Sequence, residues 1–216
     1  MARPLTHSLP SDTLEAAVRA HFGLSQEELA RYLGVTRGLV AHLEAARRPP
    51  TAALTRRLGY LAALLPPPTG HGSAAPRFGV PEPLPPLALP ALPDLGSALA
   101  AAPLRRRLLQ VRAQAARLRL ELHQAGKGSV LQQRREWGLA LLRAALPPAG
   151  VTAAAEQAHL SRWLTVLAAD IGGRAATPAQ LAVQALARLR VAALEAEAAA
   201  LAPLLARQVP PAPAGE

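Results

Sequence analysis

The chain has 216 residues, of which half are apolar and only 3% are aromatic, with 24 lysine and arginine residues against 14 aspartate and glutamate residues. It contains no cysteine, which excludes a disulfide framework and a cysteine-liganded zinc finger, and the six histidines show no HExxH-like pairing. The net charge of +10 indicates a polyanionic partner, because basic side chains that neutralise phosphates release condensed counterions.

Alanine and leucine supply most of the apolar residues, and this composition favours helices over sheets. The predicted fold class is therefore all-α. No stretch approaches the roughly 18 uninterrupted apolar residues that a membrane-spanning helix requires, so we expect a soluble, cytoplasmic protein without membrane contact. The length is typical of two small domains.

Four short helices are predicted first, over residues 12–22, 25–33, 36–46 and 52–65, within an N-terminal domain at 1–65. Residues 66–97 contain ten prolines, which remove amide donors and fix φ, so they predict a semi-extended linker. Four long helices are predicted beyond it, over 98–125, 129–146, 152–171 and 178–207. They form a C-terminal bundle at 98–209, and a disordered tail follows at 210–216. The breaks between them rest on the glycine pairs at 126/128 and 172/173 and on the prolines at 147 and 148.

The richest segment is LSQEELARYLGVTRGLVAHLEAARRPP, which predicts two helices across a very short turn. Ser25 caps the first helix, with Glu28 as its capping-box partner. Gly34 permits the left-handed conformation of a tight turn, and Thr36 caps the next helix. Burial of one face is predicted for Leu29, Ala30, Leu33, Val40 and Leu43.

These residues resemble the Cro-like repressor family, the phage-repressor type of helix-turn-helix. The resemblance covers about a quarter of the chain, including a basic-proline loop at 47–50 and a closing helix. It implies a bacterial protein that binds double-stranded DNA as a homodimer. The matching positions are Leu24, Ser25, Gln26, Leu29, Ala30, Leu33, Gly34, Val35, Thr36, Val40, Leu43 and Glu44.

The resemblance also implies which side chains meet DNA, with helix 36–46 in the major groove. Arg37 leads the predicted base contacts, because a guanidinium can fork onto guanine O6 and N7; the others are Gly38, Leu39, Ala41 and His42. Predicted backbone contacts are Gln26, Thr36, Arg47, Arg48, Arg56 and Arg57. His42, Arg56 and Arg57 are also compatible with a solvated surface, and the plain side chains of Gly38, Leu39 and Ala41 leave sequence specificity open. Glu44 is expected to be an internal structural acid.

The C-terminal half shows apolar residues at heptad spacing, which predicts helix pairing in an antiparallel four-helix bundle. The bundle is the expected dimerisation surface, and Trp137 and Trp163 are expected to be core or interface anchors. The basic outer face of the first long helix is typical of a solvated surface but also suits an acidic partner. The seams are Leu104, Leu108, Val111, Ala115, Leu118 and Leu122; Leu160, Leu164, Leu167 and Ile171; and Leu186, Leu189, Ala193 and Ala196.

The sequence therefore predicts a sequence-specific transcriptional regulator, most simply a repressor that occludes its site. The alternative is a protein-interaction module, antitoxin-like or an adaptor, whose helical half binds a partner protein. A general nucleoid-binding role would show salt dependence without sequence preference. No phosphate-binding glycine loop, nucleophile-base motif or acid pair near a histidine is recognisable, so we expect no enzyme, no metal and no cofactor.

Overall fold

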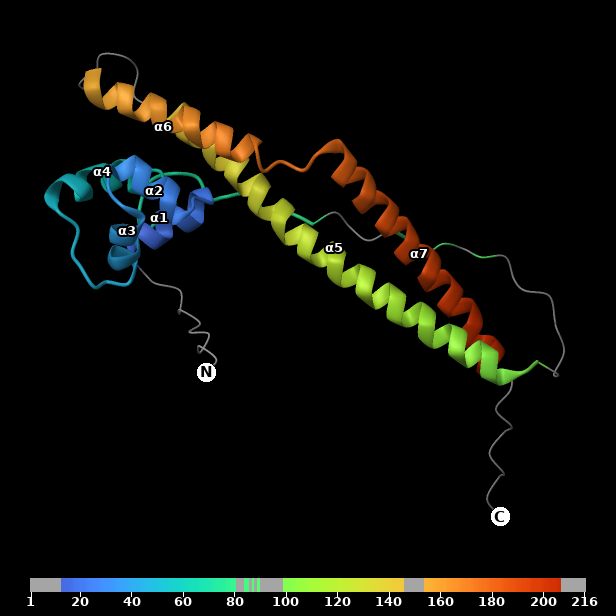
Figure 1. Cartoon of the computed structure of the whole chain (residues 1–216). Helices are drawn as coiled ribbons and strands as arrows, with labels where there is room; N and C mark the ends of the chain where they lie inside the picture. The colour runs from blue at the N-terminus through green and yellow to red at the C-terminus, as the bar shows by residue number, and fades with distance from the viewer. Residues whose placement is uncertain are drawn as a thin grey trace. The chain divides into compact units, whose positions relative to one another are not determined.

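A computed structural model of the chain describes residues 13–80, 84–85, 87, 89, 99–145 and 154–206. Every regular element among these residues is a helix, so the predicted all-α class is confirmed (Figure 1). None of the described helices is both long and apolar enough to cross a membrane. The elements are α1 (Leu14–Phe22), α2 (Gln26–Leu33), α3 (Arg37–Glu44), α4 (Ala52–Ala63), α5 (Ala101–Ala144), α6 (Ala154–Gly172) and α7 (Pro178–Ala206).

The four N-terminal helices begin and end where local capping predicts. Ser25 and Glu28 form both hydrogen bonds of the capping box at α2, and Gly34 has a φ of 73°. Thr36 accepts a hydrogen bond from the Leu39 amide at the start of α3. The first turn of α7 is also closed as predicted, because Thr177 and Gln180 exchange side-chain-to-backbone hydrogen bonds.

Two compact units emerge, and they differ from the predicted domains. Unit 1 comprises Met1–Gly79 and Val130–Ala175, and unit 2 comprises Val80–Ser129 and Ala176–Glu216. Residues 130–175 were predicted to belong to a C-terminal bundle at 98–209, whereas they pack with the four short helices. Heptad spacing indicates that a helix packs against another helix, but it does not indicate which one. Here Leu164, Leu167 and Ile171 of α6 join the core of α1–α4.

The core of unit 1 is held together by polar anchors as well as apolar side chains. The Trp163 indole nitrogen donates to the Glu28 carbonyl at 2.9 Å, and the Arg135 guanidinium pairs with the Glu28 carboxylate. Arg135 and Glu28 are 4% and 1% exposed, and Trp163 is 6% exposed. The apolar part of the cluster includes Val18, Phe22, Leu29, Leu33, Val40, Leu58, Leu139, Leu142, Leu164 and Leu167.

The predicted linker at 66–97 begins with an ordered segment. The amides of Gly70, His71 and Gly72 donate to carbonyls of Pro66, Ala63 and Leu65, so the chain folds back on the end of α4. Both glycines are required there, since a Cβ atom at either would lie within 2.2 Å of a backbone carbonyl oxygen. Much of the remaining linker and the tail at 210–216 lie outside the described residues.

Helix α5 continues through Gly126 and Gly128, where two helices were predicted. The described part of the C-terminal half therefore has three long helices instead of four. Each glycine costs a helix about 1 kcal/mol relative to alanine, which good helix formers on both sides can offset. Gly126 has a packing role instead of a breaking one, because a Cβ atom there would meet Val80 Cγ1 at 2.8 Å.

Unit 2 pairs the first part of α5 with α7. The predicted α5 seam is confirmed at its centre, where Val111 and Ala115 are buried with Leu118 against Leu194 and Ala198 of α7. Two ion pairs border this contact, Arg107 with Glu197 at 2.6 Å and Arg119 with Glu195 at 2.7 Å. The hydrogen bond from Arg107 lowers the pKa of the Glu197 carboxyl.

The predicted α7 seam needs correction. Leu186 and Leu189 are 65% and 52% exposed, while the side of α7 toward α5 carries Val191 and Leu194. Two heptad seams run along this helix on different faces, and the spacing alone does not distinguish the one that packs within the chain.

Candidate nucleic-acid interface

Helices α2 and α3 form a bihelical element around a tight turn. Gly34 ends α2 in the left-handed region, and its amide donates to the Ala30 carbonyl. Val35 is half-buried against the core, and Val40 and Leu43 fix the inner face of α3 with at most 3% exposure. The inner side of α3 is thus committed to packing, which leaves its outer side for a ligand.

The outer side of α3 is small and carries one strong hydrogen-bond donor. Arg37, Gly38 and His42 are exposed, whereas Leu39 and Ala41 are half-buried, and Leu39 packs against the core. The sequence placed all five on the projecting surface. Because Leu39 is partly used for packing, the residues free to reach a base edge are Arg37, His42 and the backbone around Gly38.

Three further arginines predicted to contact DNA are exposed. Arg47 and Arg48 lie in the turn after α3, and Arg56 lies on α4. Like Arg37, they form no ion pair with any described residue. Thr36 is exposed too, and its hydroxyl accepts the Leu39 amide at 3.3 Å. Exposed guanidinium groups suit the binding of phosphates, and Arg37 combines this with a place at the N-terminus of α3.

Glu44 ties three helices together, in keeping with the structural role expected for it. Its carboxylate is paired with Arg19 of α1, whose Nε lies 2.6 Å from Oε1, and it accepts a hydrogen bond from Gln26 Nε2 at 2.8 Å. Glu44 is only 7% exposed. This contact orients the Gln26 side chain inside the protein, and it neutralises an acid that would otherwise repel phosphate.

Arg57, a predicted backbone contact, is occupied within unit 1. Its Nη1 donates to the Leu33 carbonyl at 3.0 Å, and its Nη2 donates to Glu156 of α6 at 2.9 Å. Arg57 therefore closes the carboxyl end of α2, whereas its neighbour Arg56 points to solvent. These adjacent arginines could not be distinguished from the sequence, since the partner of Arg57 is 99 residues away.

Sequence reasoning missed the buried cluster behind this interface. Arg135 of α5 forms an ion pair with the carboxylate of Glu28, which also closes the α2 capping box. His21 lies against Phe22 and Trp137 with ring centroids 4.8 and 5.1 Å away. Burial, reinforced by Arg134, lowers the pKa of His21. The residues next to His21 in the sequence do not indicate that its side chain is buried.

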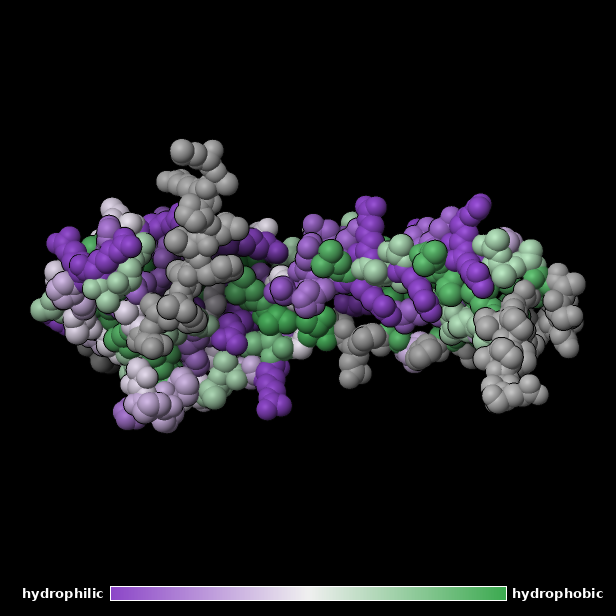
Figure 2. Space-filling view, turned by 90° about the horizontal axis from the view of Figure 1, so that it is seen from below, coloured by the Kyte–Doolittle hydropathy of each residue, from purple (hydrophilic) through white to green (hydrophobic). Residues whose placement is uncertain are grey.

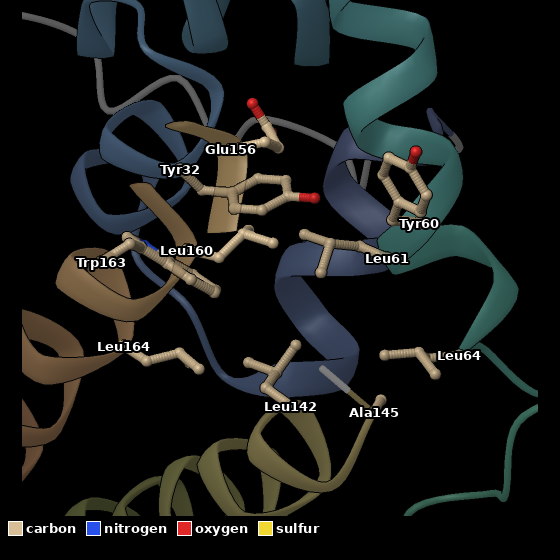
Figure 3. A pocket seen from close by; sticks show the side chains of 10 residues that line it. All are labelled: Tyr32, Tyr60, Leu61, Leu64, Leu142, Ala145, Glu156, Leu160, Trp163 and Leu164. Atoms are coloured by element: carbon tan, nitrogen blue, oxygen red, sulfur yellow. The ribbon is translucent and has the colours of Figure 1, made fainter. Parts of the chain in front are cut away.

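An apolar cavity of about 90 Å³ lies between α2, α4, α5 and α6 (Figure 3). Tyr32, Trp163 and five leucines dominate its wall, and its carboxylate, Glu156, is paired with Arg57. The Tyr32 hydroxyl donates to the Arg57 carbonyl, and burial raises the pKa of this phenol. No group of three or more potential metal ligands occurs among the described residues. The cavity residues support packing and offer no nucleophile with an adjacent base.

Residues 16–57 match the family model described as Helix-turn-helix. This stretch is a DNA-binding helix-turn-helix domain. It spans α1 to the first half of α4 and so includes every residue of the interface described above. No curated protein and no solved structure matches the chain. The helix-turn-helix assignment made from the sequence is confirmed for these residues, and the domain supports DNA binding at that general level.

Proposed function

We propose that the protein is a sequence-specific transcriptional regulator that inserts α3 into the major groove of double-stranded DNA. The observation that carries this proposal is the exposed guanidinium of Arg37 in the first turn of α3, without an ion pair among the described residues. An arginine at this place on a recognition helix can form two hydrogen bonds with a guanine.

The backbone contacts in this proposal are Thr36, Arg47, Arg48 and Arg56, which are all exposed. Gln26 remains a candidate through its place at the start of α2, because the first amides of a helix lack partners within it. Arg57 is left out because its guanidinium is bonded to Leu33 and Glu156. Each arginine that meets a phosphate adds to affinity without adding sequence information.

In this account the protein works in the cytoplasm as a homodimer and represses by covering its site. One short recognition helix reads too few bases for useful specificity, so two heads on two half-sites are needed. The expected operator has two-fold symmetry, with half-sites separated by about one helical turn, roughly 34 Å.

Selection of bound duplexes from a random pool at near-physiological salt tests this proposal. The native chain should enrich a two-fold symmetric site, and Arg37→Ala should lose or change the preference. Arg112→Ala is the matched control, because it removes an arginine of α5 that is also exposed. Binding without enrichment, or equal enrichment by Arg37→Ala, would contradict the proposed readout.

A protein-interaction role is the second candidate, and one surface favours it. Leu109 and Leu120 of α5 are 67% and 58% exposed, and Arg105, Arg112 and Arg117 are exposed on the same helix. An apolar stripe among arginines suits a partner with an acidic amphipathic segment, as an antitoxin-like or adaptor protein would bind. Copurification of one stoichiometric partner that Leu109→Glu releases would support this role.

A further inference from the structure

Helix α7 carries an apolar seam that the described residues of unit 2 leave exposed. Ala182, Leu186, Leu189 and Ala193 recur at intervals of four, three and four residues and are exposed. Leu186 and Leu189 are 65% and 52% exposed. The face that packs on α5 is a different one and includes Leu194 and Ala198. We call the exposed set the outer seam of α7.

Unit 2 has too small a core for the apolar surface it presents. Its buried apolar side chains among the described residues are Val111, Ala115, Val191, Ala192, Leu194 and Ala196, three of which are alanines. In the space-filling view, hydrophobic side chains reach the surface of this unit between hydrophilic ones (Figure 2). A helix pair that buries so little gains most of its stability from additional helix contacts.

The distribution of charged residues indicates that a second copy of this chain can bind the outer seam. The chain has a net charge of +10, so two copies meet favourably only over a face without basic residues. Residues 178–187 contain no charged side chain, and the two basic residues within the seam's span are Arg188 and Arg190. The exposed stripe of α5 around Leu109 and Leu120 fails this requirement, because four arginines border it: Arg105, Arg106, Arg112 and Arg117.

The outer seam is also self-complementary. The order Ala182, Leu186, Leu189, Ala193 reads the same in both directions, with the same intervals. In an antiparallel pair, Leu186 meets Leu189 of the second copy, and Ala182 meets Ala193 of the second copy. A two-fold dimer requires such a patch, in which residue i contacts j and j contacts i, and alanines at its ends allow close approach of the backbones.

We propose that the outer seam of α7 pairs antiparallel with the same seam of a second copy. The inference deepens the proposed function, since it assigns the homodimer contact to one face of one helix. The seam and its flanks, residues 178–197, span about 30 Å at 1.5 Å per residue. One such pair of helices buries less than the 1,200–2,000 Å² of a standard interface, so the dimer forms reversibly at micromolar concentration.

The mass of the full chain in solution tests the location of the contact. The native chain should approach the dimer mass as its concentration rises through the micromolar range. The Leu186→Glu/Leu189→Glu variant should remain monomeric with an unchanged helix content. Leu109→Glu/Leu120→Glu is the matched control and should still dimerise, because these leucines are equally exposed on α5. A monomeric native chain, or a dimer that survives Leu186→Glu/Leu189→Glu, would overturn the proposal.

The orientation has a separate test, since the chain contains no cysteine. Single variants Ala182→Cys and Ala193→Cys are made, oxidised alone and then as an equimolar mixture. An antiparallel pair predicts cross-linking in the mixture and little in either variant alone, because residues 182 and 193 are about 17 Å apart along the helix. Cross-linking of each variant with itself indicates a parallel pair and would overturn the antiparallel arrangement.

These readouts are independent of the proposed function. A native chain that selects a DNA sequence but stays monomeric removes the α7 contact and the homodimer, and it leaves base reading by α3 standing. A chain that dimerises through α7 but selects no sequence removes only the proposed regulator.

Discussion

The buried pair of Arg135 and Glu28 offers the sharpest test of how the DNA-binding helices are stabilised. The Arg135→Met substitution keeps the bulk of the side chain and removes its charge. Glu28, at 1% exposure, is then left as a buried carboxylate whose remaining hydrogen bond is the one it accepts from the Ser25 amide. Loss of one partner from a buried ion pair costs about 3–5 kcal/mol, a large share of the roughly 5–15 kcal/mol that stabilises a domain.

Urea unfolding, followed by circular dichroism and by tryptophan fluorescence, measures this cost. With a slope of about 1–3 kcal/mol per molar urea, the midpoint should fall by about 2 M. The Trp163 indole donates to the Glu28 carbonyl, so its fluorescence monitors unfolding around the buried ion pair. The Arg135→Met/Glu28→Gln double variant should recover most of the loss, because glutamine can close a capping box without a charge.

The matched control is Arg117→Met, which breaks the exposed i,i+4 pair with Glu121. Exposed pairs of this kind contribute about 0.3–0.5 kcal/mol, so the midpoint should hardly move. A cost below about 1 kcal/mol for Arg135→Met would contradict the claim that Arg135 compensates a buried charge on Glu28, since loss of one partner from a buried pair costs several times more. A double variant no more stable than the single one would contradict this claim as well.

Three further predictions concern pH, packing and DNA. The folded state lowers the pKa of His21 from 6.5, so folding favours the neutral imidazole. The contribution of His21 to the free energy of unfolding is therefore fully present above pH 6.5 and is lost as the pH drops toward the folded pKa. His21→Gln should flatten this dependence, measured as urea midpoints between pH 5 and 8. Gly138→Ala should destabilise by about 1–3 kcal/mol, because its Cβ would lie 2.6 Å from the Phe22 carbonyl oxygen. Gly128→Ala, which faces open space, should instead stabilise by about 0.5–1 kcal/mol, and equal thermal midpoints for the two would contradict the packing. Arg56→Ala should lower the slope of log K against log salt by about 1, while Arg57→Ala should leave the slope unchanged and lower the thermal midpoint, a difference that titrations at several salt concentrations measure.

Local features of the fold follow from the sequence because their causes are local. The caps at Ser25, Thr36 and Thr177 depend on residues within three positions, and the turn at Gly34 depends on its own φ. The match to a helix-turn-helix pattern could therefore be read along 27 residues without knowledge of the rest. The outer side of α3 followed from the same pattern, apart from the partial burial of Leu39.

Long-range choices could not be predicted in this way. Gly126 looks like a helix breaker until Val80 is placed against it, and Arg57 looks like Arg56 until Glu156 is placed beside it. The seam of α6 predicted burial correctly but not its partner, the core around Leu29 and Val40. In each case a second segment, far away in sequence, decides among structures that the local pattern permits equally.

The proposed function depends most directly on Arg37, which is expected to read a base. Affinities of the native chain and of Arg37→Ala are measured on the selected duplex and on duplexes with each guanine of a half-site replaced. One replacement should weaken the native chain by about 1–3 kcal/mol, as expected for a bidentate arginine contact, and should leave Arg37→Ala nearly unaffected. If every replacement weakens both proteins equally, Arg37 does not read a base and the proposed use of α3 is contradicted.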